Sequence, residues 1–120
     1  MANILIADDS TILRRGLALI LTKGGHTVVG QATNGKQACL LFEQLKPDLV
    51  TMDITMPVMD GVEALSSILK SHPAAKIIMI SALDQKKMVL EALENGAKHY
   101  LVKPYKDEKV LATINAVLNN

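Results

Sequence analysis

Hydrophobic residues along this chain fall into two alternating patterns. Short runs of apolar or β-branched residues occur five times, and between them apolar residues recur every three or four positions. Continuous runs of this length are typical of parallel strands buried on both faces, whereas the longer spacing is typical of amphipathic helices. The strands predicted in this way cover residues 4–7, 27–29, 49–52, 77–80 and 100–102.

Five helices are predicted between and after these strands. Gly24-Gly25 ends the first helix, Pro47 ends the second, and the fourth spans about residues 85–94. Strict alternation of strand and helix predicts a parallel sheet covered on both faces, which is a doubly wound α/β domain of flavodoxin-like architecture. The apolar stripes expected to face the sheet are Leu13, Leu17, Ile20 and Leu21; Ala38, Leu41, Phe42 and Leu45; Val62, Leu65 and Leu69; and Val110, Leu111, Ile114, Val117 and Leu118.

Composition excludes several classes of protein. The 120 residues are 49% hydrophobic, and 13 basic side chains nearly balance 12 acidic ones, so no broad field favours nucleic acid or an anionic membrane. The longest apolar stretch, residues 17–21, is far below the ~20 residues that cross a bilayer. A single cysteine and the lack of a signal-like opening favour a reducing compartment. We therefore expect one soluble, cytoplasmic domain over residues 1–120.

Four of the predicted strands are followed by a charged or hydroxyl side chain. Asp8 and Asp9 follow the first strand, Asp53 the third, Ser81 the fourth and Lys103 the fifth. In open parallel sheets the ligand crevice lies at the carboxyl ends of the strands, so these groups should meet there. Each residue alone has an ordinary interpretation: a helix cap for the aspartates, a turn or cap for the serine, a surface lysine.

Their convergence favours a phosphoryl-transfer site. Three neighbouring carboxylates would raise one another's pKa unless a cation intervened, and hard oxygen ligands suit Mg²⁺. Covalent hydrolases require a base-activated serine or cysteine, and that pattern is absent here. Attack by Asp53 on a phosphoryl group, with Mg²⁺ and Lys103 neutralising its charge and the Ser81 hydroxyl bonding its oxygen, fits the residue set.

The motifs at these positions resemble those of a response-regulator receiver domain, and are most similar to free-standing chemotaxis regulators of the CheY type. The resemblance extends over essentially the whole chain and implies the strand order 2-1-3-4-5 of that family. The matching segments are Ala7-Asp8-Asp9-Ser10, the stretch from Met52 to Gly61 that contains Asp53, Ser81-Ala82, Gly96-Ala97 and Val102-Lys103-Pro104.

The resemblance implies a role for each site residue. Asp53 would be the phosphoacceptor, while Lys103 and Ser81 would hold phosphoryl oxygens. Asp9, Asp53 and the Thr55 carbonyl would bind Mg²⁺ directly, and Asp8 would reach it through water. Tyr100 would be an aromatic switch that turns inward when Ser81 moves toward the phosphate, although its local sequence indicates a plain half-buried strand aromatic. The Lys103-Pro104 peptide would be cis.

These roles imply a signalling switch and not an enzyme acting on an external substrate. A histidine kinase would be the phosphodonor, and the face formed by residues 85–94, the strand 100–102 and the last helix would bind an output target such as a flagellar motor switch component. Neither nucleic acid nor membrane is expected as a direct partner. Three competing interpretations remain open: a receiver cut from a larger regulator with DNA-binding or enzymatic output, a flavin-binding electron carrier, and an aspartyl-phosphate phosphatase.

Two positions differ from the enteric chemotaxis regulator. The resemblance suggests that this regulator has an amide side chain at the first position and a carboxylate at the second. The two positions are Thr55, two residues after the phosphoacceptor, and Leu83, two residues after the hydroxyl. Neither side chain can orient a water as those groups could, so we expect slower self-dephosphorylation.

The remaining reactive residues receive ordinary interpretations. Cys39 is expected to be a buried, inert thiol, and the methionines are expected to fill the core. The three histidines have no ligand spacing, so they are expected at the surface or in turns: His26, His72 and His99.

Overall fold

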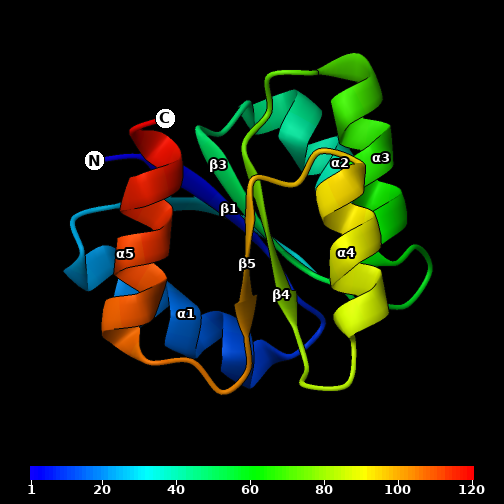
Figure 1. Ribbon diagram of the computed structural model, residues 1–120. Coiled ribbons are helices and arrows are strands. Elements are labelled where there is room, and N and C mark those ends of the chain that lie inside the picture. Colours follow the sequence, from blue (N-terminus) through cyan, green and yellow to red (C-terminus); the bar gives the residue numbers. More distant parts are fainter.

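The computed structural model describes residues 1–120 as five strands alternating with five helices (Figure 1). None of the helices is long and apolar enough to span a membrane. The elements are β1 (Asn3–Ala7), α1 (Thr11–Lys23), β2 (Thr27–Ala32), α2 (Gly35–Leu45), β3 (Leu49–Asp53), α3 (Gly61–Ser71), β4 (Ile77–Ser81), α4 (Lys86–Glu94), β5 (His99–Val102) and α5 (Asp107–Leu118).

All neighbouring strands pair in parallel, in the order β2-β1-β3-β4-β5. The predicted doubly wound fold and its strand order are therefore confirmed. The register pairs Asp53 with Ile80 and Ser81 with Val102, so the last residues of β3, β4 and β5 are near neighbours. This register is what brings the side chains at the strand ends to one edge of the sheet.

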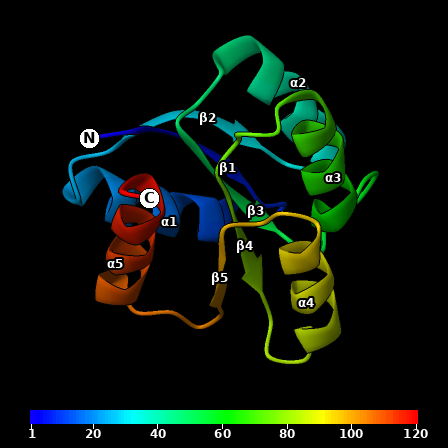
Figure 2. The same cartoon turned by 45° about the horizontal axis from the view of Figure 1, so that its top comes forward.

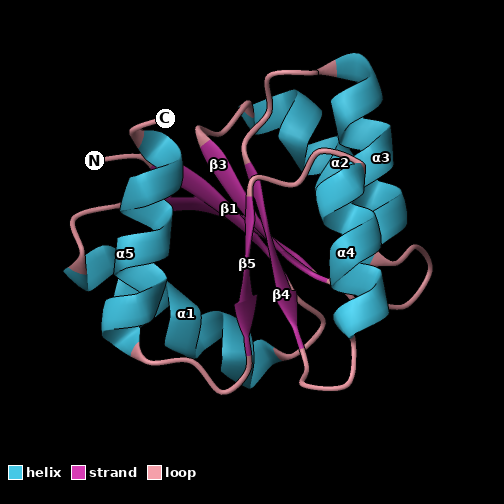
Figure 3. Ribbon diagram, in the orientation of Figure 1, coloured by secondary structure: helices cyan, strands magenta, loops and turns pink.

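Helices cover both faces of the sheet and enclose two separate cores. Helices α1 and α5 lie on one face, and α2, α3 and α4 lie on the other (Figures 2 and 3). The core beneath α1 and α5 includes Ile4, Ile6 and Ile114, whereas the opposite core includes Leu5, Val50 and Leu65. Successive residues of one strand enter opposite cores, which explains why the central strands are apolar without interruption.

The predicted helix faces differ from the structure at a few positions. Leu13 and Leu45 are 37% and 39% exposed, because each lies at the end of its helix beyond the sheet-covering stripe. Leu41, Leu69, Leu111 and Leu118 are half-buried. The strands also extend past the predicted limits, since ladder hydrogen bonds continue into polar residues: β2 reaches Ala32, and β3 and β4 include Asp53 and Ser81.

The prediction of a surface or turn position was wrong for His26. This histidine is only 6% exposed, and both ring nitrogens are buried without a hydrogen-bond partner. Burial, together with the positive N-terminal amine, lowers the pKa of its imidazole. His26 follows the Gly24-Gly25 turn directly, and the return of the chain into β2 carries the ring inward.

The sulfur-containing side chains largely follow the prediction. Met52, Met56 and Met79 are buried, and Met59 and Met88 pack against the core beneath α2, α3 and α4. Cys39 is half-buried on α2, so it is less enclosed than predicted.

The loop between β3 and α3 is closely fitted to the end of β3. The amide of Gly61 donates a hydrogen bond to the carbonyl of Ile54 at 2.7 Å, and a Cβ at Gly61 would overlap the carbonyl oxygen of Asp53. In the same loop Val58 has φ of 69°, a left-handed conformation that β-branched residues rarely adopt. The backbone here is therefore held against its local preference by the elements around it.

Gly61→Ala should destabilise the protein because the added methyl group would force the start of α3 away from β3. We expect a loss of about 1–3 kcal/mol in the free energy of unfolding, measured by urea titration. Gly16→Ala is the matched control: a Cβ at Gly16 in α1 meets nothing within 4 Å, so alanine should add about 0.5–1 kcal/mol. Equal stability of the two variants would contradict the close fit at Gly61.

Candidate functional site

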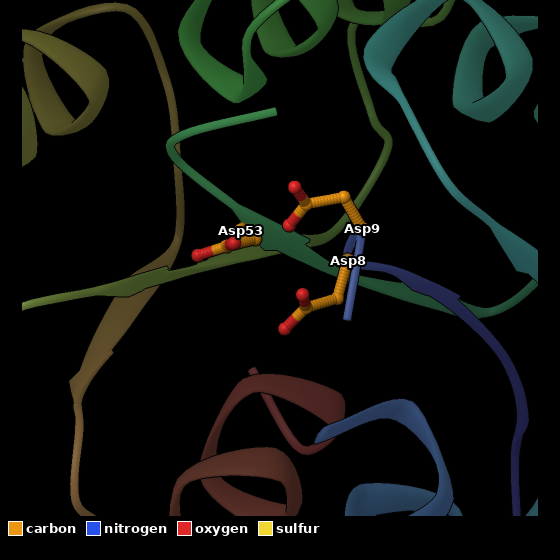
Figure 4. Close-up of side chains that lie close together, drawn as sticks. All are labelled: Asp8, Asp9 and Asp53. Atoms are coloured by element: carbon orange, nitrogen blue, oxygen red, sulfur yellow. The ribbon is translucent and has the colours of Figure 1, made fainter. Parts of the chain in front are cut away.

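Three carboxylates converge at the carboxyl edge of the sheet. Asp8 and Asp9 follow β1, Asp53 ends β3, and carboxylate oxygens of all three lie within 4.8 Å of one another (Figure 4). Asp8 and Asp53 are only 5% and 6% exposed, whereas Asp9 is exposed. The two adjacent strands thus place negative charge at one point, as the sequence predicts.

Local hydrogen bonds fix the backbone that carries the first two aspartates. Asp8 accepts the amide hydrogen of Ser10 at 2.9 Å, and Ser10 in turn caps α1 by accepting from the amide of Leu13. Arg14, one turn into α1, donates to the carbonyl oxygen of Asp8 at 2.7 Å. Because Ser10 is the helix cap, the simple capping interpretation of Asp8 and Asp9 does not apply, and Asp9 has no side-chain bond of its own.

Lys103 brings the opposing positive charge. Its Nζ lies 3.2 Å from an oxygen of Asp53 and 3.6 Å from an oxygen of Asp8. Its backbone amide donates to the carbonyl of Ser81 at 2.8 Å, which ties the segment after β5 to the end of β4. The Lys103-Pro104 peptide is cis, as the resemblance implies. The lysine is therefore part of the site and not a free surface residue.

The electrostatics of the site leave negative charge uncompensated. Burial, with a further contribution from the Asp8 carboxylate, raises the pKa of Asp53 from 3.8 to about 6, although Lys103 acts in the opposite direction. Removing a carboxylate from water disfavours its charged form, and a second carboxylate nearby adds to that effect. A single lysine does not balance three carboxylates, so the site has capacity for a further cation.

Ser81 supplies a polar group with no partner in the protein. It is 1% exposed, and its Oγ makes no hydrogen bond. The cap position of α4 is occupied by Gln85, so the interpretation of Ser81 as the cap of this helix is wrong. Buried hydroxyls normally have a partner, so the Ser81 hydroxyl is available to bond a group at the carboxyl edge of the sheet.

The donor set fits a hard divalent cation. Carboxylate oxygens from Asp8, Asp9 and Asp53 are the ligands that Mg²⁺ prefers, and the raised pKa of Asp53 is the unfavourable condition that a bound cation would relieve. The backbone of Thr55, two residues beyond Asp53, lies in the loop next to the cluster.

Three residues near the site carry no signal in the sequence pattern. Arg14 bonds the backbone carbonyl of Asp8. Tyr105 is the second of these residues: burial, together with the Asp8 and Asp53 carboxylates, raises the pKa of its phenol. Gln85 bonds both Thr55 and Ala82 in the loops after β3 and β4. Hydrophobic periodicity does not mark these residues, although Tyr105 directly follows the Lys103-Pro104 motif.

Tyr100 lies on the edge strand β5. It is 39% exposed, which is more than its local sequence indicates. It lines a groove of about 310 Å³ between α4 and β5, and Ser81 is also part of the lining. The groove also contains the exposed side chains of Leu83 and Leu90.

Comparison with known proteins gives a consistent result. Residues 4–115 match the family model of the response regulator receiver domain. Chemotaxis protein CheY of Thermotoga maritima is 48% identical over 115 residues, which is 96% of each chain. CheY of Bacillus subtilis is 48% identical over 117 residues, 98% of each chain.

A solved structure shares the fold closely. The crystal structure of the CheX-CheY-BeF3-Mg+2 complex from Borrelia burgdorferi superimposes with a TM-score of 0.92 at 39% identity, covering 96% of this chain and 87% of that one.

The charge on Asp53 should make stability depend on pH in the absence of divalent metal. The folded pKa of about 6 exceeds the ordinary 3.8, so ionised Asp53 destabilises the fold above pH 6, and this cost disappears as the pH falls toward 4. Asp53→Asn should therefore be more stable than the wild type at pH 7 by about 1–2 kcal/mol, reduced from the full shift by solvent screening.

Urea unfolding of both proteins between pH 4 and 8 measures this difference. It should shrink as the pH falls from 6 toward 4. A difference for Asp53→Asn that stays constant with pH would contradict the raised pKa.

Proposed function

We propose that this chain, which belongs to the response regulator receiver domain family, is a two-component signalling switch that takes a phosphoryl group onto Asp53 from a histidine kinase in the cytoplasm. The phosphorylated form then changes its affinity for a protein target, in chemotaxis or flagellar motor control. The single observation that carries the proposal is the meeting of Asp53 with Asp8, Asp9 and Lys103 at one edge of the sheet.

The chemistry at Asp53 follows from its surroundings. An ionised oxygen of Asp53 attacks the phosphorus of a phosphohistidine; the new O–P bond forms as the P–N bond breaks, and the departing imidazole nitrogen takes up a proton. Lys103, 3.2 Å from the nucleophile, offsets charge on the incoming phosphoryl oxygens. The unpartnered hydroxyl of Ser81 donates a hydrogen bond to one of those oxygens.

Asp9, Asp53 and the Thr55 carbonyl would hold Mg²⁺ directly, with Asp8 reaching it through water. When bound, Mg²⁺ supplies positive charge that neutralises the carboxylates and the phosphoryl oxygens. Arg14 and Ser10 hold the Asp8 backbone in place and so keep the acidic pair close to Asp53.

We propose that the face formed by α4, β5 and α5 is the surface that binds the output target. The groove between α4 and β5 supports this assignment. It extends from Ser81, at the phosphorylation site, to Tyr100 on the outer surface, and Leu83 and Leu90 expose apolar area along it. A hydroxyl that turns toward a phosphoryl group would vacate space at the inner end of this groove. Tyr100, the proposed switch, could fill that space and change the surface that a partner meets.

The relatives support a role in chemotaxis. The two CheY proteins are 48% identical to this chain and are matched over 96% and 98% of their own length. Family membership leaves the flavin carrier and the phosphatase without support. The partners proposed are a histidine kinase and a protein of the motor switch.

Phosphoryl uptake tests the proposal directly. Wild-type protein incubated with a radiolabelled small acyl phosphate and Mg²⁺ should take up label to about one group per chain, and removal of Mg²⁺ by a chelator should abolish uptake. Asp53→Asn should take up none. Asp60→Asn, the same substitution in the following loop, keeps its role as the cap of α3 and should label like the wild type. Equal labelling of both variants would place the phosphate elsewhere.

The decay rate of the phosphorylated form tests the expectation from Leu83. Leu83 is 80% exposed, so Leu83→Glu introduces a carboxylate near the site without disturbing packing. A carboxylate that can orient water should speed loss of phosphate about tenfold or more, because positioned acid–base groups contribute about 10²–10⁴-fold in favourable cases. Leu90→Glu, farther along the same groove, is the control. If both variants decay at the wild-type rate, the assignment of slow decay to Leu83 is wrong.

A further inference from the structure

One side chain joins the two loops that flank the proposed phosphorylation site. Gln85 Oε1 accepts a hydrogen bond from the amide of Ala82 at 2.7 Å, and Gln85 Nε2 donates to the hydroxyl of Thr55 at 2.5 Å. The orientation of the carboxamide follows from its partners: a backbone amide can only donate, so it faces the oxygen. Thr55 lies two residues after Asp53, and Ala82 follows Ser81.

The turn before α4 accounts for half of this arrangement. Gln85 is the cap residue of α4 but makes no side-chain cap bond; its backbone amide donates to the carbonyl of Ala82 at 3.3 Å, and its carboxamide accepts from the amide of the same residue. The turn does not account for the second bond, which crosses to a loop thirty positions away in the sequence. The carboxamide therefore spans from the end of β4 to the loop after β3.

The two hydrogen bonds of Gln85, to Ala82 and to Thr55, form a bridge between the loops. This bridge and a phosphoryl group would compete for the backbone amide of Ala82. A phosphoryl oxygen that bonds the Ser81 hydroxyl lies at the carboxyl end of β4, where the next donor along the chain is the amide of Ala82. That amide is occupied by Gln85 Oε1. Charged oxygens form stronger hydrogen bonds with backbone amides than neutral ones do, and they repel the lone pairs of the glutamine oxygen. Occupation of the site should therefore displace Gln85.

We propose that Gln85 is a positioning residue that ties the two loops together in the unphosphorylated protein and so lowers its affinity for the phosphoryl group. This inference rests on the proposed function of Asp53. A contact that is present only in the unphosphorylated state stabilises that state relative to the phosphorylated one. The free energy needed to break the bridge therefore reduces the free energy gained when the phosphoryl group binds. Removing the bridge therefore favours the phosphorylated arrangement.

Isothermal titration calorimetry with beryllofluoride in saturating Mg²⁺ tests the bridge. Variants of Gln85 and of Thr55 are compared with the wild type. Gln85→Ala removes the whole carboxamide, whereas Thr55→Val removes only the acceptor of the second bond and leaves the contact with Ala82. Each variant should bind about three- to tenfold more tightly than the wild type, the range expected for loss of ordinary hydrogen bonds. The double variant should bind no more tightly than Gln85→Ala, because both changes break one bridge.

Conservative variants separate the bridge from unrelated effects. Thr55→Ser keeps the hydroxyl and should restore the wild-type affinity. Thr55 is exposed and Gln85 half-exposed, so the variants should fold, and circular dichroism with urea unfolding checks this.

The outcomes distinguish this inference from the proposed function. A wild-type protein that does not bind beryllofluoride overturns both, since the bridge would have nothing to oppose. Wild-type binding with unchanged or weaker binding in the single variants leaves the function standing and overturns the bridge. Tightening in Gln85→Ala alone assigns the effect to the turn before α4, and fully additive tightening shows two unrelated effects; either result also overturns the bridge.

Discussion

Repulsion among three carboxylates held in one small volume is the constraint on which the site depends. The parallel sheet places Asp8 and Asp53 at neighbouring strand ends where both are almost fully buried, so neither can move into solvent to escape the other. Burial, together with the Asp8 carboxylate, raises the pKa of Asp53 to about 6, because Lys103 offsets only part of these effects. The fold thus maintains a charge arrangement that is unfavourable by itself and that a bound cation would relieve.

This unfavourable arrangement is supported by an otherwise consistent fold. Both faces of the sheet are covered, the central strands are buried at every residue, and the loop after β3 is fixed by bonds from Gly61 and Met59. Natural proteins commonly keep local strain at functional sites and offset it through the surrounding packing. Here the strain is electrostatic, and the two apolar cores on either side of the sheet offset it.

The sequence predicted the strands and the convergence of the charged residues, because uninterrupted apolar runs and their polar ends follow directly from burial in a parallel sheet. The strand order came from the resemblance to the receiver family, since periodicity alone does not determine it. The sequence did not predict the inward position of His26, which depends on how the turn at Gly24-Gly25 returns the chain. It also missed Gln85, Arg14 and Tyr105. Their roles rest on polar contacts and charges at the edge of the sheet, and hydrophobic periodicity carries no information about these.

The left-handed backbone of Val58 has a consequence for engineering this protein. A β-branched residue at φ of 69° holds about 1–2 kcal/mol of conformational energy that glycine or asparagine would largely release. The side chain is 79% exposed, so an exchange there would disturb no packing. Glycine or asparagine at residue 58 would therefore raise the thermal tolerance of the protein without removing a packed side chain.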